Sequence, residues 1–191
     1  GPSDGSVIKP AAGRTEHAFV LANGLNPEYG KLDAAQMTWI AIDEAFRNAV
    51  ACGADPSRVA LLDNFCWGDP NRPEIMGDLV KSAQACYDAA VCYQSPFISG
   101  KDSFNNEYLG SEGKVHAIPP TLLISALGWM PTWRQAVSVD FKNPGNLVYL
   151  VGYFYPTFGG SHYNLTHHSE KVEEGLPPCH PGNINTYKAF Y

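Results

Sequence analysis

Short apolar runs alternate with two long segments of helical periodicity, and this alternation most constrains the fold of the chain. Apolar residues recur at three- and four-residue spacing after Asp33, and again from about Glu74 to Tyr93, which predicts two amphipathic helices. Short apolar runs around these helices predict strands over 18–25, 59–65, 96–99 and 121–130. Strands interleaved with helices indicate an α/β or α+β fold.

Capping residues mark both ends of the first predicted helix. Asp33 has the chemistry of an N-cap, and Gln36 three residues later completes a capping box. Gly53 stands where a helix commonly ends. After the last predicted strand of the sheet, Pro131 and a polar stretch indicate a domain boundary, and one further strand is expected over 147–154.

Charge and cysteine content exclude several classes of protein. The formal net charge is −6 without a cluster of Lys and Arg, which argues against nucleic-acid binding, although a few local donors suffice for a phosphorylated small molecule. The chain has 5 cysteines, an odd number with no CxxC pair, so reduced thiols are expected. Neither a secretory signal nor a membrane span is apparent, and we expect a cytoplasmic protein.

A polar pair ends one of the predicted strands. Asp63 and Asn64 follow the apolar residues that begin at Val59. A carboxylate and an amide at a strand end can coordinate a hard cation or accept a hydrogen bond from a nucleotide. The same two residue types also cap a loop in an Asx-turn. Both interpretations remain open from the residues alone.

A second polar motif follows the predicted strand at 96–99. In Gly100-Lys101-Asp102-Ser103 the glycine permits close backbone approach, and successive N–H groups can hold a phosphate. Lys101 supplies a positive charge, Asp102 a candidate metal ligand and Ser103 a hydroxyl donor. The motif lacks the spacing of a Walker A sequence, and a solvated turn between strands is the alternative.

Two weaker groups of polar residues favour a structural role. Glu44, Arg47 and Asn48 share the first helix, where they are expected to pair with the chain's own loops or across an interface. Another group lies near the C-terminus, where a strand-end turn is favoured over a ligand site and the histidines lack metal-ligand spacing. Its members are Gly159, Gly160, Ser161, His162, His167 and His168.

Taken together, the motifs resemble the phosphoribosylformylglycinamidine (FGAM) synthase family. Several independent motifs in one order are more specific than any single motif, and here they extend over about residues 1–165. The segments that carry the resemblance are 3–10, 43–48, 53–56, 61–70 with Arg72-Pro73-Glu74, 96–103, 105–107, 118–121 and 159–161.

The resemblance implies the fold of the aminoimidazole ribonucleotide (AIR) synthetase-like superfamily. An N-type domain over 1–135 would be α+β, with a four-stranded mixed sheet, helices on one face and the other face pairing into a barrel with a second N-type domain. A truncated C-type α/β domain would begin over 136–191. The chain matches the second half of the enzyme, and the first half, which holds the catalytic histidine, has no counterpart in it. No catalytic residue is therefore assigned.

The resemblance also implies a reaction and its ligands. In this family ATP phosphorylates the amide oxygen of formylglycinamide ribonucleotide (FGAR), and glutamine-derived ammonia displaces the phosphate. ATP contacts fall on Asp63 and Gly100, with Lys101 alongside, and a substrate contact falls on Ser103. The better-known bacterial form has a metal-binding Asn where this chain has Lys101. Either Asp102 takes over the Mg²⁺ role or Lys101 replaces the charge of the ion.

Partners follow from the same resemblance. The other half of the synthetase and a glutaminase domain or subunit are expected, and the chain alone is expected to form a homodimer through its exposed sheet face. Two alternatives remain. The chain is a non-catalytic nucleotide-binding lobe of the same enzyme, or it belongs to another ATP-dependent enzyme of the superfamily.

Overall fold

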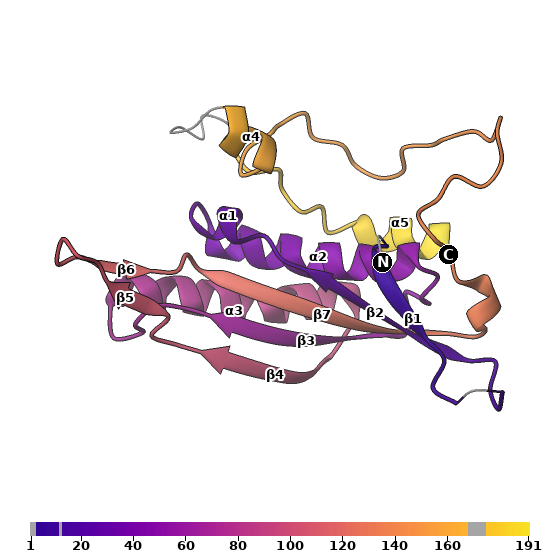
Figure 1. The fold of residues 1–191 in the computed structure, drawn as a ribbon, viewed down its shortest axis with the longest axis horizontal. Helices are drawn as coiled ribbons and strands as arrows, with labels where there is room; N and C mark the ends of the chain where they lie inside the picture. The colour runs from indigo at the N-terminus through magenta and orange to yellow at the C-terminus, as the bar shows by residue number, and fades with distance from the viewer. Residues whose placement is uncertain (1–2, 12, 168–174) are drawn as a thin grey trace.

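A five-stranded mixed sheet is the centre of the computed structural model, which describes residues 3–11, 13–167 and 175–191 (Figure 1). The strand order is β1-β2-β7-β3-β4, with β3 and β4 parallel and every other neighbouring pair antiparallel. In that order the strands are β1 (Gly5–Ile8), β2 (Ala18–Gly24), β7 (Thr121–Met130), β3 (Val59–Cys66) and β4 (Phe97–Ser103).

Each of the four expected strands is present, but two expectations were wrong in detail. The sheet has a fifth strand, β1, which is only 4 residues long and therefore too short to show a period in sequence. Strand β4 continues to Ser103, so residues 100–103 are part of the strand and not a loop. Parallel pairing with β3 supplies the hydrogen bonds that keep this polar, glycine-containing segment extended.

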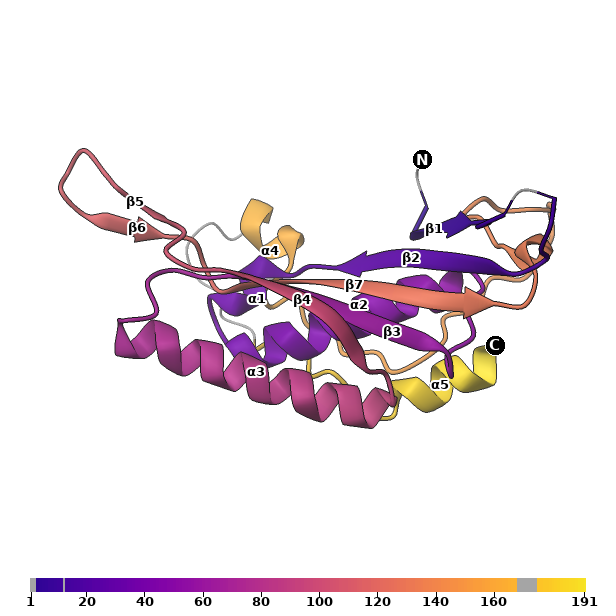
Figure 2. The same ribbon diagram turned by 90° about the horizontal axis from the view of Figure 1, so that it is seen from below.

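Helices cover one face of the sheet, as expected, with α2 (Ala34–Ala51) and α3 (Pro73–Tyr93) on the same side (Figure 2). The strands facing α2 alternate between buried and more exposed residues, so one face of the sheet forms the core. On the other face Phe19 and Leu21 remain 39% and 41% exposed. The core residues contributed by β2 and β7 are Ala18, Val20, Ala22, Leu122, Ile124, Ala126 and Met130.

The predicted helix ends are confirmed by the backbone. The Asp33 side chain accepts a hydrogen bond from the Gln36 N–H at 2.9 Å, as expected of an N-cap. The Asp33 N–H donates to the Tyr29 carbonyl at 2.8 Å and not to the Gln36 side chain, so the expected capping box is not completed. Tyr29 belongs to the short helix α1 (Pro27–Gly30), which precedes α2. Gly53 has φ +106° just after the helix, a conformation that favours glycine.

A small hairpin, β5 (Glu107–Leu109) with β6 (Val115–Ala117), projects from one end of the sheet (Figure 2). It was not expected from sequence, since each strand has only 3 residues. The signal was in the turn, where Gly110 and Gly113 flank two polar residues between the strands.

The C-terminal part of the chain has little regular structure in its described residues. A 3₁₀ turn, η1 (Trp133–Gln135), follows the sheet, and the two helices are α4 (His162–His167) and α5 (Asn183–Phe190). The strand expected over 147–154 is absent, and Leu150 is 84% exposed. An extended run needs a neighbouring strand to satisfy its backbone groups, and none lies beside this one in the described structure. The barrel and the boundary at residue 135 stay predictions.

Helix α5 returns to the body of the domain and packs near α2. Ile184 is buried at 5% exposure, and the Tyr187 ring stacks on Phe46 with a centroid distance of 6.0 Å. Among the described residues, no helix is both long and apolar enough to cross a lipid bilayer.

Glycine at position 24 is a requirement of the helix–sheet contact. A Cβ added there would lie 1.9 Å from the Ala41 carbonyl oxygen of α2, so we expect Gly24→Ala to lower the free energy of unfolding by about 1–3 kcal/mol. The same substitution at Gly77, inside α3, meets no atom within 4 Å and is expected to raise it by roughly 0.5–1 kcal/mol. Urea denaturation of both variants measures whether the free energy of unfolding changes in these opposite directions. A Gly24→Ala variant with the stability of the wild type would contradict the close approach of α2 to the sheet.

Candidate functional site

The predicted site residues lie in the carboxyl-terminal halves of the parallel pair β3 and β4. Strand β3 continues to Cys66, so Asp63 and Asn64 lie within the strand and not, as was expected from sequence, at its end. The strand register places Asp63 beside Gly100 and Asn64 beside Lys101, and the pairing ends at Ser103. Parallel strands bring their carboxyl ends to one edge of the sheet, which is where α/β proteins commonly bind ligands. The structure thus brings the two polar motifs together, and β4 is the edge strand of the sheet.

Alternation along β4 separates the predicted residues onto two faces of the sheet. Successive strand residues point to opposite sides, so Gly100 and Asp102 belong to the helix-covered face together with their neighbour Asp63. Lys101 and Ser103 belong to the open face, where the Lys101 Nζ donates to the Ser103 Oγ. Asp102, the candidate metal ligand, and Lys101, the candidate cation, therefore lie on different faces of the same strand.

Asp63 occupies a half-buried position that depends on the glycine beside it. A Cβ at Gly100 would lie 2.2 Å from the Asp63 Oδ1, so a larger residue would displace the carboxylate. Burial, followed by the negative charge of Asp102, raises the pKa of Asp63 above its ordinary value of 3.8. On α3, burial and then the charge of Asp63 raise the pKa of the Cys86 thiol to about 12. The Asp63 carboxylate thus faces the helical layer.

The loop after β4 is fastened to the end of β3 by backbone and side-chain hydrogen bonds. The Ser103 carbonyl accepts from the Trp67 N–H at 2.8 Å and from the Asn106 Nδ2 at 2.7 Å. The Glu107 carboxylate accepts from the Asp69 N–H at 3.1 Å and forms an ion pair with Arg72, which begins α3 as its N-cap. A role of these residues in positioning Ser103 was not expected from the sequence.

Of the polar residues on α2, Glu44 binds one of the chain's own loops, as expected, whereas Asn48 binds strand β2 and Arg47 pairs with Asp43 of the same helix. Glu44 accepts from the Leu25 N–H at 2.9 Å and from the Asn26 Nδ2 at 2.7 Å. The Asn48 Nδ2 donates to the Asn23 carbonyl at 3.0 Å. These bonds hold the end of β2 against the helix.

The glycine turn near the C-terminus packs against the body of the domain. A Cβ at Gly160, which has φ +69°, would lie 2.4 Å from the Tyr29 ring, so close packing accounts for this glycine. In α4, His167 stacks on Tyr163 with a centroid distance of 4.2 Å. His168 lies outside the described residues. Within the part of the chain that the structure describes, no three His, Cys, Asp or Glu side chains form a metal-binding group.

Repulsion between two carboxylates can be tested by titration. Asp102→Asn removes one negative charge from the edge strand and should lower the pKa of Asp63, although burial, the larger cause, should keep it above 3.8. Carbon-detected NMR titration measures this shift directly. The Asp63 carboxyl binds its proton more tightly in the folded chain than in the unfolded chain. Protonated Asp63 therefore stabilises the fold below pH 3.8, and this stabilisation is lost as the pH rises through the pKa of the folded state.

The matched control is Asp78→Asn, which removes the same charge from an exposed position on α3 where Asp78 pairs with Lys81. This variant should leave the Asp63 titration unchanged. Equal effects of the two variants would show that Asp102 does not act on Asp63 locally.

Comparison with curated proteins finds relatives named as PurL subunits of phosphoribosylformylglycinamidine synthase. Subunit PurL of phosphoribosylformylglycinamidine synthase from Chelativorans sp. is 34% identical over 164 residues, which are 84% of this chain and 21% of the relative. The Thermomicrobium roseum PurL is 33% identical over 178 residues, covering 93% of this chain and 23% of the relative. The chain therefore spans about a fifth of the length of these relatives.

Solved structures share the fold at low sequence identity. Thermotoga maritima PurL complexed with ADP has a TM-score of 0.60 and 23% identity, covering 71% of this chain and 21% of that chain. The same protein complexed with FGAR has a TM-score of 0.60 and 24% identity, covering 71% and 20%. A HypE–HypF complex covers 95% of this chain and 54% of that chain, with a TM-score of 0.59 and 13% identity.

The family itself is established by a match over most of the chain. The model of the family described as AIR synthase related protein, N-terminal domain, matches residues 2–130, which include the whole five-stranded sheet. The chain therefore belongs to the AIR synthase related protein family.

Proposed function

We propose that this chain is the nucleotide-handling part of an FGAM synthase, which uses ATP to convert FGAR to its amidine with glutamine-derived ammonia. The observation that carries the proposal is the pairing of Asp63 with Gly100, which sets a carboxylate beside a bare backbone at a sheet edge. Support comes from relatives named PurL and from the fold shared with PurL structures complexed with ADP, ATP and FGAR.

The proposed reaction couples two transfers. The γ-phosphoryl group of ATP passes to the amide oxygen of FGAR, and ADP leaves. Ammonia then attacks the activated carbon, and the carbon–oxygen bond breaks to release phosphate and leave the amidine. Both steps require groups that neutralise negative charge on phosphate within a site that excludes water.

The position of β4 explains how residues on two faces could serve one nucleotide. Because β4 is an edge strand, a ligand lying over its free edge reaches both sides of the sheet. Asp63 would then bind from the helix-covered side, and Gly100 would allow close approach of the phosphates. Lys101 would act from the open side as a cation near phosphate, with Ser103 placed for a substrate hydroxyl.

The residues present fit a magnesium ion of the kind that accompanies ATP. Asp63 and Asp102 are carboxylates on the same face of adjacent strands, and Mg²⁺ commonly takes one or two carboxylates and completes its shell with phosphate oxygens and water. When bound, the ion would neutralise charge on the transferring phosphoryl group. The charged Lys101 cannot be a ligand, so it adds to this neutralisation from the other side of β4.

A non-catalytic role for the same nucleotide site is the second candidate. It is favoured by the Ser103 hydroxyl, which already accepts a hydrogen bond from Lys101 Nζ within the chain and is therefore less available to a substrate. Photo-crosslinking of FGAR in the full-length protein separates the two, because a structural lobe would bind nucleotide without contacting FGAR.

Removal of the Asp63 carboxylate should weaken nucleotide binding. We expect Asp63→Ala in the full-length protein to reduce ATP affinity at least tenfold, about 1.4 kcal/mol, because a metal–phosphate contact is lost. Isothermal calorimetry with Mg²⁺ and ATP measures this change. Asp78→Ala on the exposed side of α3 serves as the control with unchanged affinity.

Lys101→Met, measured in the same way, tests the second contact. It should also weaken ATP binding, and Lys101→Asn should increase the dependence of turnover on Mg²⁺. The outcome that would contradict the role of Asp63 is an Asp63→Ala variant that keeps its fold and binds ATP as tightly as the wild type.

We further propose that the open sheet face is an interface. In the full-length protein it would pair with the other half of the synthetase, and a glutaminase domain or subunit would supply ammonia. The isolated chain would pair with a second copy, since its open face has a contiguous apolar region. The residues in this region are Ile8, Phe19, Leu21, Leu127 and Trp129. The cytoplasmic location expected from sequence stays a prediction.

Self-association should depend on the open face. The 191-residue chain should form a dimer that makes no FGAM, and Leu21→Lys should shift it to a monomer by placing a charge in the apolar region. Sedimentation equilibrium measures both states. Val80→Lys, at a position 60% exposed on α3, adds the same charge elsewhere and should leave the dimer intact. A wild-type chain that stays monomeric at high concentration would contradict this interface.

A further inference from the structure

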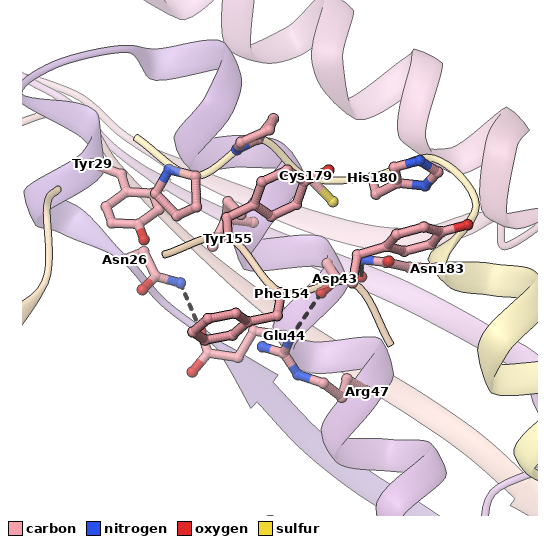
Figure 3. Close-up of a pocket in the computed structure, with 14 residues that line it drawn as sticks. Asn26, Tyr29, Asp43, Glu44, Arg47, Phe154, Tyr155, Cys179, His180 and Asn183 are labelled. Carbon is pink, nitrogen blue, oxygen red and sulfur yellow. Dashed lines mark hydrogen bonds and ion pairs between the residues drawn. The ribbon is translucent and has the colours of Figure 1, made fainter. Parts of the chain in front are cut away.

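A cavity of about 290 Å³ lies between α2 and the C-terminal segment (Figure 3). Its floor is one face of α2, where Ile40, Asp43, Glu44 and Arg47 follow at three- and four-residue spacing. Its other walls come from α1 and from residues 153–155 and 177–180. None of these residues belongs to the strand edge discussed above, so the cavity is independent of the proposed nucleotide site.

Asp43 ties together the elements around this cavity through partners on both of its carboxylate oxygens. One of its carboxylate oxygens accepts from the Tyr93 hydroxyl at 2.5 Å, the Tyr187 hydroxyl at 2.8 Å and the Asn183 Nδ2 at 3.0 Å. The other pairs with the Arg47 Nη1 at 3.2 Å. Burial, followed by the Asp43 charge, raises the pKa of both tyrosines, so they remain donors and tie α5 to the helical layer.

Glu44 and Arg47 retain hydrogen-bonding capacity toward the cavity. Glu44 uses its Oε2 for two neutral donors, the Leu25 N–H and the Asn26 Nδ2, and among the described residues its Oε1 has no hydrogen-bond partner. Arg47 pairs with Asp43 through a single nitrogen, and its side chain is 54% exposed. A carboxylate oxygen and a guanidinium edge of opposite charge are therefore available side by side.

The aromatic residues complete a recognisable environment for a small ligand. Figure 3 shows Phe154 over the Glu44 and Arg47 side chains and Tyr29 beside Asn26. On the same wall, Tyr153 stacks on His180 with a centroid distance of 3.7 Å. Such rings attract an ammonium group and shield it from water. Burial and then Glu44 raise the pKa of Tyr29 while Arg47 lowers it, which places this hydroxyl near both charges.

We propose that the cavity binds a free α-amino acid, with the ligand ammonium on Glu44 and the ligand carboxylate on Arg47. A ligand with both charges complements both side chains, whereas a simple cation meets repulsion from Arg47 and a simple anion meets repulsion from Glu44. A guanidinium is well suited to a carboxylate because its N–H groups match the two oxygens. The small volume selects a free amino acid over a larger molecule.

The test is NMR titration of the 191-residue chain with glycine, L-glutamine and L-phenylalanine. At least one should shift the Arg47 and Asn26 side-chain signals in a saturable way. The N-acetyl and methyl-ester forms of the same amino acid should bind at least tenfold more weakly, since each lacks one charge. If none of the three binds, or if the blocked forms bind as well as the free amino acid, the proposal is overturned.

Substitutions can distinguish the effect of the Glu44 charge on binding from the effect of its hydrogen bonds on the structure of the site. Glu44→Gln keeps an oxygen that can accept from the Leu25 N–H and the Asn26 Nδ2, yet it removes the charge, so it should cost at least tenfold in affinity. Glu28→Gln makes the same change at the Glu28–Lys31 pair outside the cavity and should have no effect. Equal affinity of the two variants would overturn the assignment. If Glu44→Gln does not fold, the blocked amino acids decide the question on the wild-type chain.

Discussion

The close packing of α2 on the sheet is the contact on which the rest of this structure depends. A Cβ at Gly24 would lie 1.9 Å from the Ala41 carbonyl, and one at Gly128 would lie 2.5 Å from the Ala54 methyl group. Where such contacts occur, even an alanine in place of the glycine would push the layers apart. Ala45, between the same layers, is fully buried. This spacing sets the position of both faces of α2, one against the core and the other toward the C-terminal segment.

The candidate site residues come together at one edge of the sheet because β3 and β4 run parallel. Parallel pairing requires the long connection through α3, and the two strands then present their carboxyl ends together. The edge position of β4 leaves one side of the strand unpaired, so a ligand there has access to Asp63 from one face and Lys101 from the other. If β4 were an interior strand, paired neighbours on both sides would keep a single ligand from reaching around its edge to both faces.

Buried polar contacts help to attach the C-terminal helix, together with the packing of Ile184 and Tyr187. Ile184 is its one buried residue, whereas Asp43 receives hydrogen bonds from both Asn183 and Tyr187. The Asp43 side chain is only 3% exposed, and burying a carboxylate without partners would destabilise the fold. The donors on α5 therefore complete the set of hydrogen bonds that α2 and α3 begin around this carboxylate. The same contacts define the wall of the cavity beside Glu44.

The amino-acid sequence by itself determined the features that depend on neighbouring residues. Helical periodicity, the Asp33 cap and Gly53 located the first helix, and apolar runs located four strands of the sheet. The polar groups at Asp63 and at 100–103 were likewise visible as candidate site residues, although the residue types alone left a turn or loop cap as the alternative.

Tertiary structure decided everything that needs a partner distant in sequence. Strand β1 exists because β2 offers an unpaired edge, and residues 100–103 are extended because β3 lies beside them. The run at 147–154 has the composition of a strand but no neighbour within the described structure, so it forms none. Register then separated Lys101 from Asp63, since a shift of one residue reverses the face of a side chain, and register is a property of pairing between strands.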